Sequence, residues 1–258
     1  MAKSIEHINK ELQHLTGYTL SIYLNTSPDR EDWRIRLKNG LKRMKEYITA
    51  SNPEQAKNFT KISKRVEKAI RDHQTSLSNS LVCFVSDGHM NMYHLQIPVE
   101  NDFQWKKGPA TEQLQAKFDE YPKCGVVLLQ NNKVTLITSV LGELIHEMHY
   151  EIDLETNNWK EYKGTASGNI YSGGANHREK FNRRLKENQA RWYRQIVPTI
   201  NRFARQQQWQ SVHLAGPAEL TKTMRNLLSI KVNGETTRNY SGKSAHAILN
   251  RTILASSS

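Results

Sequence analysis

The stretch "CGVVLLQNNKVTLITSV", residues 124–140, decides the fold class of the second half of the chain. Two apolar runs rich in valine, leucine and isoleucine flank the turn-forming pair Asn131 and Asn132. This pattern predicts an antiparallel hairpin. Residues 143–153, "ELIHEMHYEID", alternate in a way that suits a third antiparallel strand. The hairpin therefore begins a sheet.

A helical crossover and a return strand are predicted downstream of this sheet. A loop rich in Gly and Ser leads into a long helix that begins near His177 and runs to Gln208, and Pro198 should kink or split it. Residues 211–217 predict a buried strand, and residues 218–228 a short helix. The order β-β-β, loop, α, β, α predicts a mixed sheet with helices packed against it.

The first half of the chain predicts a separate α/β unit. "YTLSIYLNT" (18–26) is typical of a buried strand, and two helices are expected at 30–48 and 53–76. A hairpin is predicted around Asp87 and Gly88. We therefore assign the chain to the α/β (α+β) class with two domains.

The length of 258 residues is ample for two such domains. We expect an N-terminal α/β domain over 1–115 and a second domain, with the mixed β-β-β-α-β-α sheet, over 116–258. Only Cys83 and Cys124 are present, far apart and outside any CxxC. This argues against a disulfide framework or a thiolate metal site. We expect no cofactor and no metal.

The net charge indicates a polyanionic partner. Lys and Arg total 37 against 25 Asp and Glu, which gives +12. Cationic surfaces release counterions from phosphate backbones, although a basic protein kept soluble by its charge is an open alternative. No apolar run approaches the ~20 residues that cross a bilayer, and the first 15 residues lack the apolar core of a signal peptide. We therefore expect a cytoplasmic protein without a membrane partner.

The long helix concentrates this charge. Nine cations lie between His177 and Gln208, opposed only by Glu179 and Glu187, a net of +7. They are Arg178, Lys180, Arg183, Arg184, Lys186, Arg191, Arg194, Arg202 and Arg205. An apolar stripe should face the sheet, so the arginines should take the opposite face. Because arginine binds phosphate with two N–H groups, we favour phosphate contact over a merely solvated face.

The helix predicted at 30–48 is basic too. Asp29 or Asp32 should cap it. Trp33, Leu37, Leu41, Met44 and Ile48 form its apolar stripe. Its candidate RNA-binding residues are Arg34, Arg36, Lys38, Lys42 and Arg43.

The loop before the long helix holds Gly173 and Gly174, which let the backbone approach a bulky partner. An ordinary connection is the alternative. "SGGANHREKFNRRLKENQARWY" (172–193) and "HLAGPAELTKTMRN" (213–226) resemble the archaeo-eukaryotic class-I release factors and their bacterial branch, which is related to the hibernation factor Balon and to Pelota. In that family a Gly-Gly-Gln loop precedes a basic helix on a middle domain with this order of elements. The stretch 21–44 is similar to the entry strand and basic helix of the bacterial branch.

The resemblance implies action in the ribosomal A site, with the loop at the peptidyl-transferase centre. Gly173 and Gly174 match the motif, whereas Ala175 stands in place of the catalytic glutamine and Asn176 follows it. Alanine cannot position water against the ester, so we expect no release of the usual kind. Relatives without the glutamine serve in ribosome rescue, or in hibernation as Balon does.

Three functions therefore stay open. The first is an A-site factor for hibernation or rescue that binds rRNA and P-site tRNA through residues such as Arg178, Lys180, Arg183, Arg184 and Arg191. The second is hydrolysis of peptidyl-tRNA, or cleavage of tRNA, with Asn176 or His177 holding the water. The third is general RNA binding. Only 30 residues follow Leu228, too few for the family's third domain, so a translational GTPase such as elongation factor Tu stays an open partner.

Some motifs do not support a site. "SGKS" (241–244) lacks the first glycine and the context of a phosphate-binding loop. His146 and His149 have the wrong spacing for a zinc protease, and on a strand they face opposite ways. Trp159, Tyr162 and Tyr171 flank the Gly-rich loop. They are candidates for base stacking, although we expect at least one of them to pack beneath the loop.

Overall fold

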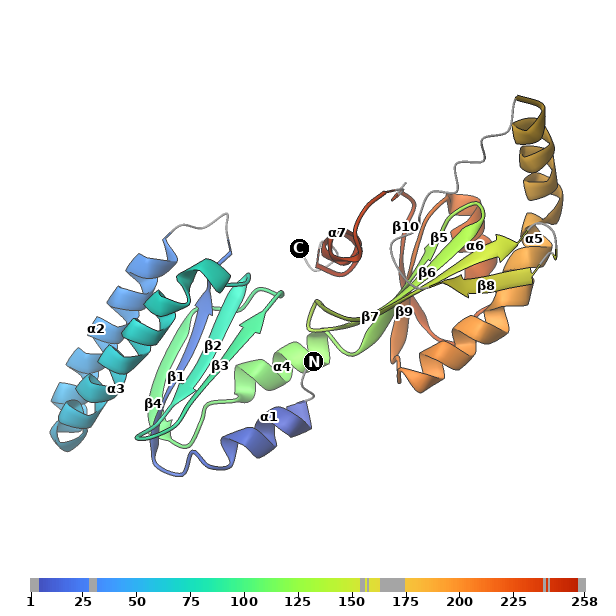
Figure 1. The fold of residues 1–258 in the computed structure, drawn as a ribbon. Helices are drawn as coiled ribbons and strands as arrows, with labels where there is room; N and C mark the ends of the chain where they lie inside the picture. The colour runs from blue at the N-terminus through green and yellow to red at the C-terminus, as the bar shows by residue number, and fades with distance from the viewer. Residues whose placement is uncertain are drawn as a thin grey trace. The chain divides into compact units, whose positions relative to one another are not determined.

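The computed structural model describes residues 5–27, 32–153, 156, 158–162, 175–238, 240 and 242–254. Only the backbone is described at 76, 162, 175–187 and 254. The chain divides into two compact units, residues 1–120 and 121–258, and each contains one β-sheet with helices packed on it (Figure 1). The predicted α/β class is confirmed.

Unit 1 is built on a four-stranded antiparallel sheet with the order β3-β2-β1-β4. Its elements are α1 (Ile5–Leu12), β1 (Tyr18–Asn25), α2 (Trp33–Ser51), α3 (Pro53–Asp72), a 3₁₀ turn (Gln74–Ser76), β2 (Ser80–Val85), β3 (Met90–Leu95), β4 (Asp102–Lys107) and α4 (Glu112–Glu120). The predicted strand at 18–26 and the hairpin around Asp87 are confirmed, and α3 ends four residues before its predicted end.

Alternation along β1 explains the layers of unit 1. Leu20 and Ile22 are fully buried and pack with Leu41 of α2 and Ile62 of α3 on one face of the sheet. Tyr23 lies on the other face, where its hydroxyl donates a hydrogen bond to the Ala110 carbonyl at 2.7 Å. Both faces of the sheet are therefore covered, with α2 and α3 on one side (Figure 1).

Unit 2 is built on a six-stranded mixed sheet with the order β10-β9-β5-β6-β7-β8. Its elements are β5 (Cys124–Leu129), β6 (Lys133–Val140), β7 (Glu143–Asp153), β8 (Asn158–Tyr162), α5 (Ala175–Gln206), β9 (Ser211–Ala215), α6 (Ala218–Arg225), β10 (Val232–Thr236), α7 (Ala245–Leu249) and a π-helical turn (Asn250–Leu254). β9 runs parallel to β5 and β10, and the other pairs are antiparallel. The predicted mixed sheet is confirmed, and β8 and β10 extend it.

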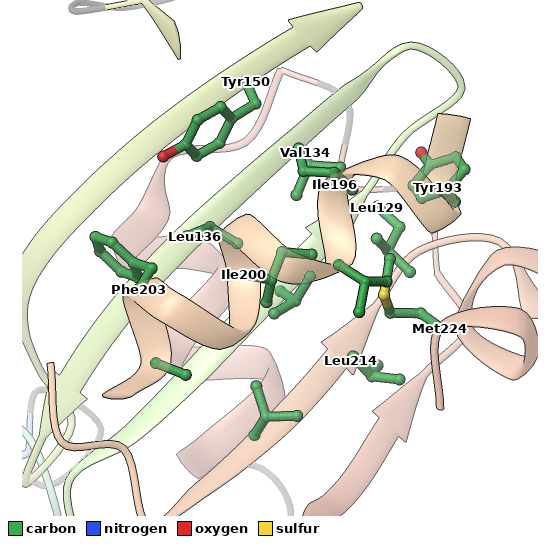
Figure 2. Packing of buried hydrophobic residues seen from close by; sticks show 14 of the residues in the cluster. Leu129, Val134, Leu136, Tyr150, Tyr193, Ile196, Ile200, Phe203, Leu214 and Met224 are labelled. Atoms are coloured by element: carbon green, nitrogen blue, oxygen red, sulfur yellow. The ribbon is translucent and has the colours of Figure 1, made fainter. Parts of the chain in front are cut away.

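Helices cover both faces of this sheet. Ile196 and Ile200 of α5 and Met224 of α6 pack on Leu136 and Leu214 of the sheet, as Figure 2 shows. Ile248 and Leu249 of α7 pack with Val126 and Ile137 on the opposite face. α5 is therefore fixed to the sheet by its own apolar stripe.

The glycine-proline turn after β9 has a steric cause. Gly216 has a φ of +139°, and a Cβ there would lie 2.3 Å from the Leu129 carbonyl oxygen. Glycine is thus the residue that fits, and Pro217 then takes the N-cap position of α6.

The predicted split of the long helix at Pro198 is wrong. α5 runs without interruption from Ala175 to Gln206 with Pro198 inside it. Proline removes one backbone donor, but its exposed ring points away from the sheet while Val197 and Ile200 on either side are buried. Burial of the flanking residues holds the helix together across the proline.

A candidate nucleic-acid interface

The described part of α5 separates apolar from cationic residues as predicted. Trp192 and Tyr193 are buried, and four arginines are exposed: Arg191, Arg194, Arg202 and Arg205. Among the residues that the structure describes, none of these arginines forms an ion pair with a carboxylate. The exposed face of the helix thus offers charge that the described protein groups leave unneutralised.

Aromatic side chains fix α5 where this cationic face begins. The Trp159 indole N–H donates to the Trp192 carbonyl oxygen at 2.7 Å, and its ring meets the Tyr193 ring edge-on at 5.7 Å. The Tyr193 hydroxyl donates to the Gln130 carbonyl, and burial raises the pKa of this phenol well above its usual range. Trp159 therefore packs against α5, whereas its predicted position beneath the loop involves residues outside the description. Tyr171 and the Tyr162 side chain lie outside the described residues.

The tip of the predicted site is described only in part. Gly173 and Gly174 lie outside the described residues, and α5 begins at Ala175, two residues before the predicted start. Asn176 and His177 are therefore in the first turn of the helix. The side chains of Ala175, Asn176, His177, Arg178, Lys180, Arg183 and Arg184 lie outside the description. Their roles stay predictions.

α2 carries the second group of predicted contacts. Arg36 directs Nε and Nη2 at the Asp32 carboxylate at 2.8 and 2.7 Å, and Lys42 lies 3.9 Å from Glu46. Arg34 donates to the Gln74 side chain at 3.0 Å. The remaining two predicted residues, Lys38 and Arg43, are exposed and have no ion pair with any residue that the structure describes.

The side chain of Asp32 does not cap α2, although the sequence offered it as one of two candidate caps. It occupies the N-cap position of α2, but its carboxylate makes no capping hydrogen bond and binds Arg36 one turn later. The backbone of Asp32, with φ −80° and ψ 1°, lies outside the extended region that a capping residue typically adopts, which explains why its side chain does not cap the helix. The other predicted cap, Asp29, lies outside the described residues.

Sequence reasoning missed the charge of α3. This helix has six cations against three acids, and α2 has six against one, a net of +8 over the two helices. The cations of α3 are Lys57, Lys61, Lys64, Arg65, Lys68 and Arg71, all exposed. Their spacing of three or four residues opposite the buried Phe59 and Ile62 was the signal that could have found them. Lys61 is paired with Asp87 at 2.9 Å.

Comparison with known proteins identifies the family. The family model for bacterial archaeo-eukaryotic release factor family 5 matches residues 122–254, which are 133 of the 258 residues. The chain belongs to this family. The match begins just before β5 and ends with the last turn of the described chain, so it takes in the whole sheet of unit 2 and α5. The release-factor resemblance of the loop, the basic helix and the Gly-Pro turn is thereby confirmed at the level of the family.

Other similarities extend over both units. A Bacillus subtilis (strain 168) protein named uncharacterized protein YocB is 27% identical over 240 residues, which cover 91% of each chain. A solved archaeal protein matches with a TM-score of 0.34 and 11% identity, over 97% of this chain and 74% of that one. The crystal structure of the archaeal translation termination factor aRF1 matches with a TM-score of 0.34 and 14% identity, over 95% and 71%.

The remaining motifs have structural roles in this family member. His146 lies against the Phe203 ring at 5.5 Å, whereas His149 contacts Thr135 at 3.2 Å. The Ser244 hydroxyl accepts a hydrogen bond from the Ala247 N–H and caps α7, so "SGKS" is not a phosphate loop. In the described ranges there is no group of three or more His, Cys, Asp or Glu residues that could hold a metal ion. None of the helices described is long and apolar enough to span a membrane.

Proposed function

We propose that this release-factor-like protein binds the ribosomal A site, with the Gly173–Gly174 loop toward the peptidyl-transferase centre, and acts in hibernation or rescue. The observation that carries the proposal is the exposed arginine face of α5, which the described carboxylates leave unpaired. It lies on the one helix of the family-matched region that directly follows the glycine loop. Ala175 in place of glutamine supports occupancy over ester cleavage.

The geometry of α5 suits a partner made of RNA. The apolar residues between Trp192 and Ala204 are buried in unit 2, so the part of the helix whose side chains are described offers a partner cations and little apolar surface. Guanidinium groups on a fixed helix bind phosphates with two N–H groups at a small loss of entropy. The partner is then rRNA or the acceptor end of P-site tRNA.

Co-sedimentation with ribosomes at graded salt tests the proposal. We expect the double variant Arg183→Glu with Arg184→Glu to lower ribosome affinity at least about ten-fold. It should also reduce the slope of log affinity against log salt concentration by about 2. The matched control reverses two exposed cations elsewhere in unit 2, Lys222→Glu with Lys243→Glu, and should keep most of the affinity. Equal loss in both pairs would mean that net charge alone governs binding.

Two further measurements separate the alternatives. Stalled ribosome–nascent-chain complexes mixed with the purified protein should keep their peptide, and freed peptide would favour hydrolysis with Asn176 or His177 as the water-holding residue. Structured RNAs unrelated to the ribosome should compete poorly, and equal competition would favour a general RNA-binding protein.

A further inference from the structure

A pocket in unit 1 lies apart from α5 and has its own chemistry. It has a volume of about 510 Å³ and opens between α2 and the start of β4. Its walls are Arg36, Asn39, Gly40, Arg43, Met44 and Tyr47 of α2, with Asn101, Asp102 and Phe103 opposite. Cations, amides and an aromatic ring thus meet in one concave site.

Gly40 and Phe103 meet in the lining of this pocket. Glycine in a helix interior costs roughly 1 kcal/mol relative to alanine. A Cβ at Gly40 would lie 2.4 Å from the Phe103 ring, so the strand packs directly against the helix backbone. The floor of the pocket is therefore rigid backbone and ring.

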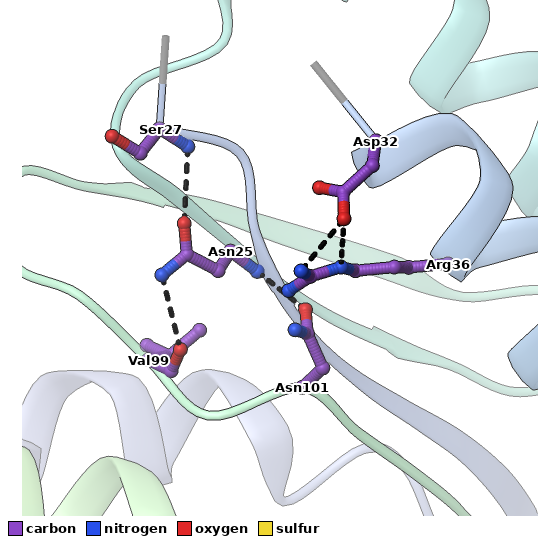
Figure 3. Close-up of polar contacts among 6 residues, drawn as sticks. All are labelled: Asn25, Ser27, Asp32, Arg36, Val99 and Asn101. Carbon is purple, nitrogen blue, oxygen red and sulfur yellow. Dashed lines mark hydrogen bonds and ion pairs between the residues drawn. The ribbon is translucent and has the colours of Figure 1, made fainter. Parts of the chain in front are cut away.

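Polar groups on the strand side are held in place. Asn101 accepts a hydrogen bond from the Asn25 backbone N–H at 2.8 Å, and Asn25 in turn reaches the Val99 carbonyl (Figure 3). This leaves the Asn101 amino group without a partner among the described residues. Asp102 accepts a hydrogen bond from Gln104 at 2.6 Å through one oxygen. A fixed donor and a carboxylate acceptor therefore line one wall.

The helix side supplies charge and a stacking surface. The Tyr47 side chain is 68% exposed, and Arg43 lies one turn before it on the same face, without an ion pair to any described residue. Arg36 is held by Asp32, as Figure 3 shows, so Arg43 is the cation available to a ligand. An exposed aromatic ring beside a guanidinium is the arrangement that binds unpaired bases.

We propose that this pocket binds one unpaired nucleotide of RNA. The base stacks on Tyr47, its polar edge meets Asn101 and Asp102, and the adjoining phosphate binds Arg43. The Asp102 carboxylate repels an anion on the strand side of the pocket, so the phosphate is placed at Arg43 on the helix side. This inference deepens the proposed function and rests on RNA as the partner.

A paired strand would engage the site differently. In a duplex the bases stay stacked on each other, so an A-form helix can reach Arg43 with a phosphate but cannot place a base on Tyr47. Single strands and duplexes of the same sequence thus separate the stacking contribution from the charge contribution.

The test uses the full chain with a fluorescent mixed-sequence single-stranded RNA of about nine nucleotides and the corresponding RNA duplex, followed by fluorescence anisotropy. We expect Tyr47→Ala to weaken single-strand binding about ten-fold and duplex binding less than two-fold, while Tyr47→Phe retains wild-type affinity. Ile35→Ala removes an equally exposed apolar side chain of α2 outside the pocket, and should change neither.

The contribution of Arg43 to RNA binding is tested in the same assay. Arg43→Gln should weaken binding of both RNAs and lower the slope of log affinity against log salt concentration by about 1. Lys45→Gln makes the same charge change outside the pocket and should have a smaller effect on both. Unchanged single-strand affinity in Tyr47→Ala, or equal loss in Tyr47→Phe, overturns the pocket. Ribosome co-sedimentation of the same samples keeps the two proposals apart. If the wild type binds ribosomes but the pocket variants behave as controls in the RNA assay, this inference alone is rejected. If the wild type shows no salt-sensitive binding to ribosomes, the proposed function is rejected.

Discussion

α2 and α5 are both cationic helices packed on a sheet, yet they use their charge differently. Arg36 of α2 is bound by the protein's own Asp32, and buried residues from Leu37 to Ile48 hold the helix along most of its length. Arg191 and Arg194 of α5 have no carboxylate partner among the described residues. α2 therefore holds part of its charge within unit 1 and leaves Lys38 and Arg43 without an ion pair to the residues described, whereas all four arginines described on α5 are available to an external anion.

The chain contains a probe for each unit in this comparison. Cys83 lies in β2 of unit 1 and Cys124 in β5 of unit 2. Burial raises the pKa of both thiols, that of Cys124 to about 12, so neither thiolate forms in the folded state near neutral pH. Thiol labelling in urea should therefore report the unfolding of each unit separately.

The largest expected effect is on the anchor of α5. Trp192→Ala removes a side chain that is 1% exposed and should lower the free energy of unfolding of unit 2 by about 3–5 kcal/mol. Labelling of Cys124 should then begin at lower urea while that of Cys83 stays unchanged. Phe59→Ala, in the core of unit 1, should do the reverse. If either variant exposes both thiols together, the units do not unfold independently.

A second pair of variants compares two glycines that aromatic rings approach. A Cβ at Gly125 would lie 2.2 Å from the Trp209 ring, and one at Gly40 would lie 2.4 Å from Phe103. Gly125→Ala should cost about 1–3 kcal/mol in unit 2 by overpacking. Gly40→Ala should cost less, because the helix gains about 1 kcal/mol from alanine.

Urea midpoints from the two thiols measure both glycine variants. Gly17→Ala is the control, since no atom lies within 4 Å of a Cβ built there. A loss at Gly17 as large as that at Gly125 would show that strand and turn propensity matters more than the ring contacts.

A smaller effect concerns the charge difference itself. Arg191→Gln with Arg194→Gln should weaken ribosome binding roughly ten-fold, because two unpaired cations are lost. Asp32→Asn frees Arg36 from its pair and should tighten RNA binding by α2 about two-fold, since an exposed ion pair is weak. Filter binding at two salt concentrations measures both. If Asp32→Asn weakens binding, the pair positions Arg36 for RNA instead of withholding it.

The smallest expected effect is a pH dependence. Burial lowers the pKa of His213 in unit 2 and of His94 in unit 1, where the charge of His73 adds to the effect. Below about pH 6.5 the unfolded chain therefore binds more protons than the folded one, and each unit loses stability as the pH falls. Unit 2 should be the more sensitive, because His213 is partly buried and hydrogen-bonded to Thr236, whereas His94 is only partly removed from solvent. Urea midpoints of Cys124 labelling at pH 7.5 and 5.5 should differ less in His213→Gln.

Local signals predicted most of the fold. The hairpins at Asp87–Gly88 and Asn131–Asn132 are encoded by turn residues between apolar runs, and both form. β8 was missed because "NWKEY" is polar, and its place depends on Trp159 packing against a helix far along the chain. The split of the helix expected at Pro198 does not occur, because burial of Val197 and Ile200 stabilises the helix more than proline destabilises it.

The candidate site, too, could be predicted only where local sequence signals determine it. The exposed arginines of α5 followed from helical periodicity, and their exposure is found wherever their side chains are described. The pocket between α2 and β4 could not be predicted, because it requires Gly40 to meet Phe103 across two elements of unit 1. The pairing of Asp32 with Arg36 needed coordinates too, since a capping role fits the same residue.

α5 starts well before the first buried side chain that the structure describes on it. Its first buried anchor among the described side chains is Trp192, whereas the helix begins at Ala175 and extends away from the sheet in Figure 1. At 1.5 Å per residue this lead corresponds to about 26 Å of helix. In the proposed A-site complex, this length would let the helix enter a narrow opening while the sheet of unit 2 stays outside, and each turn removed before Trp192 would shorten that reach by about 5.4 Å.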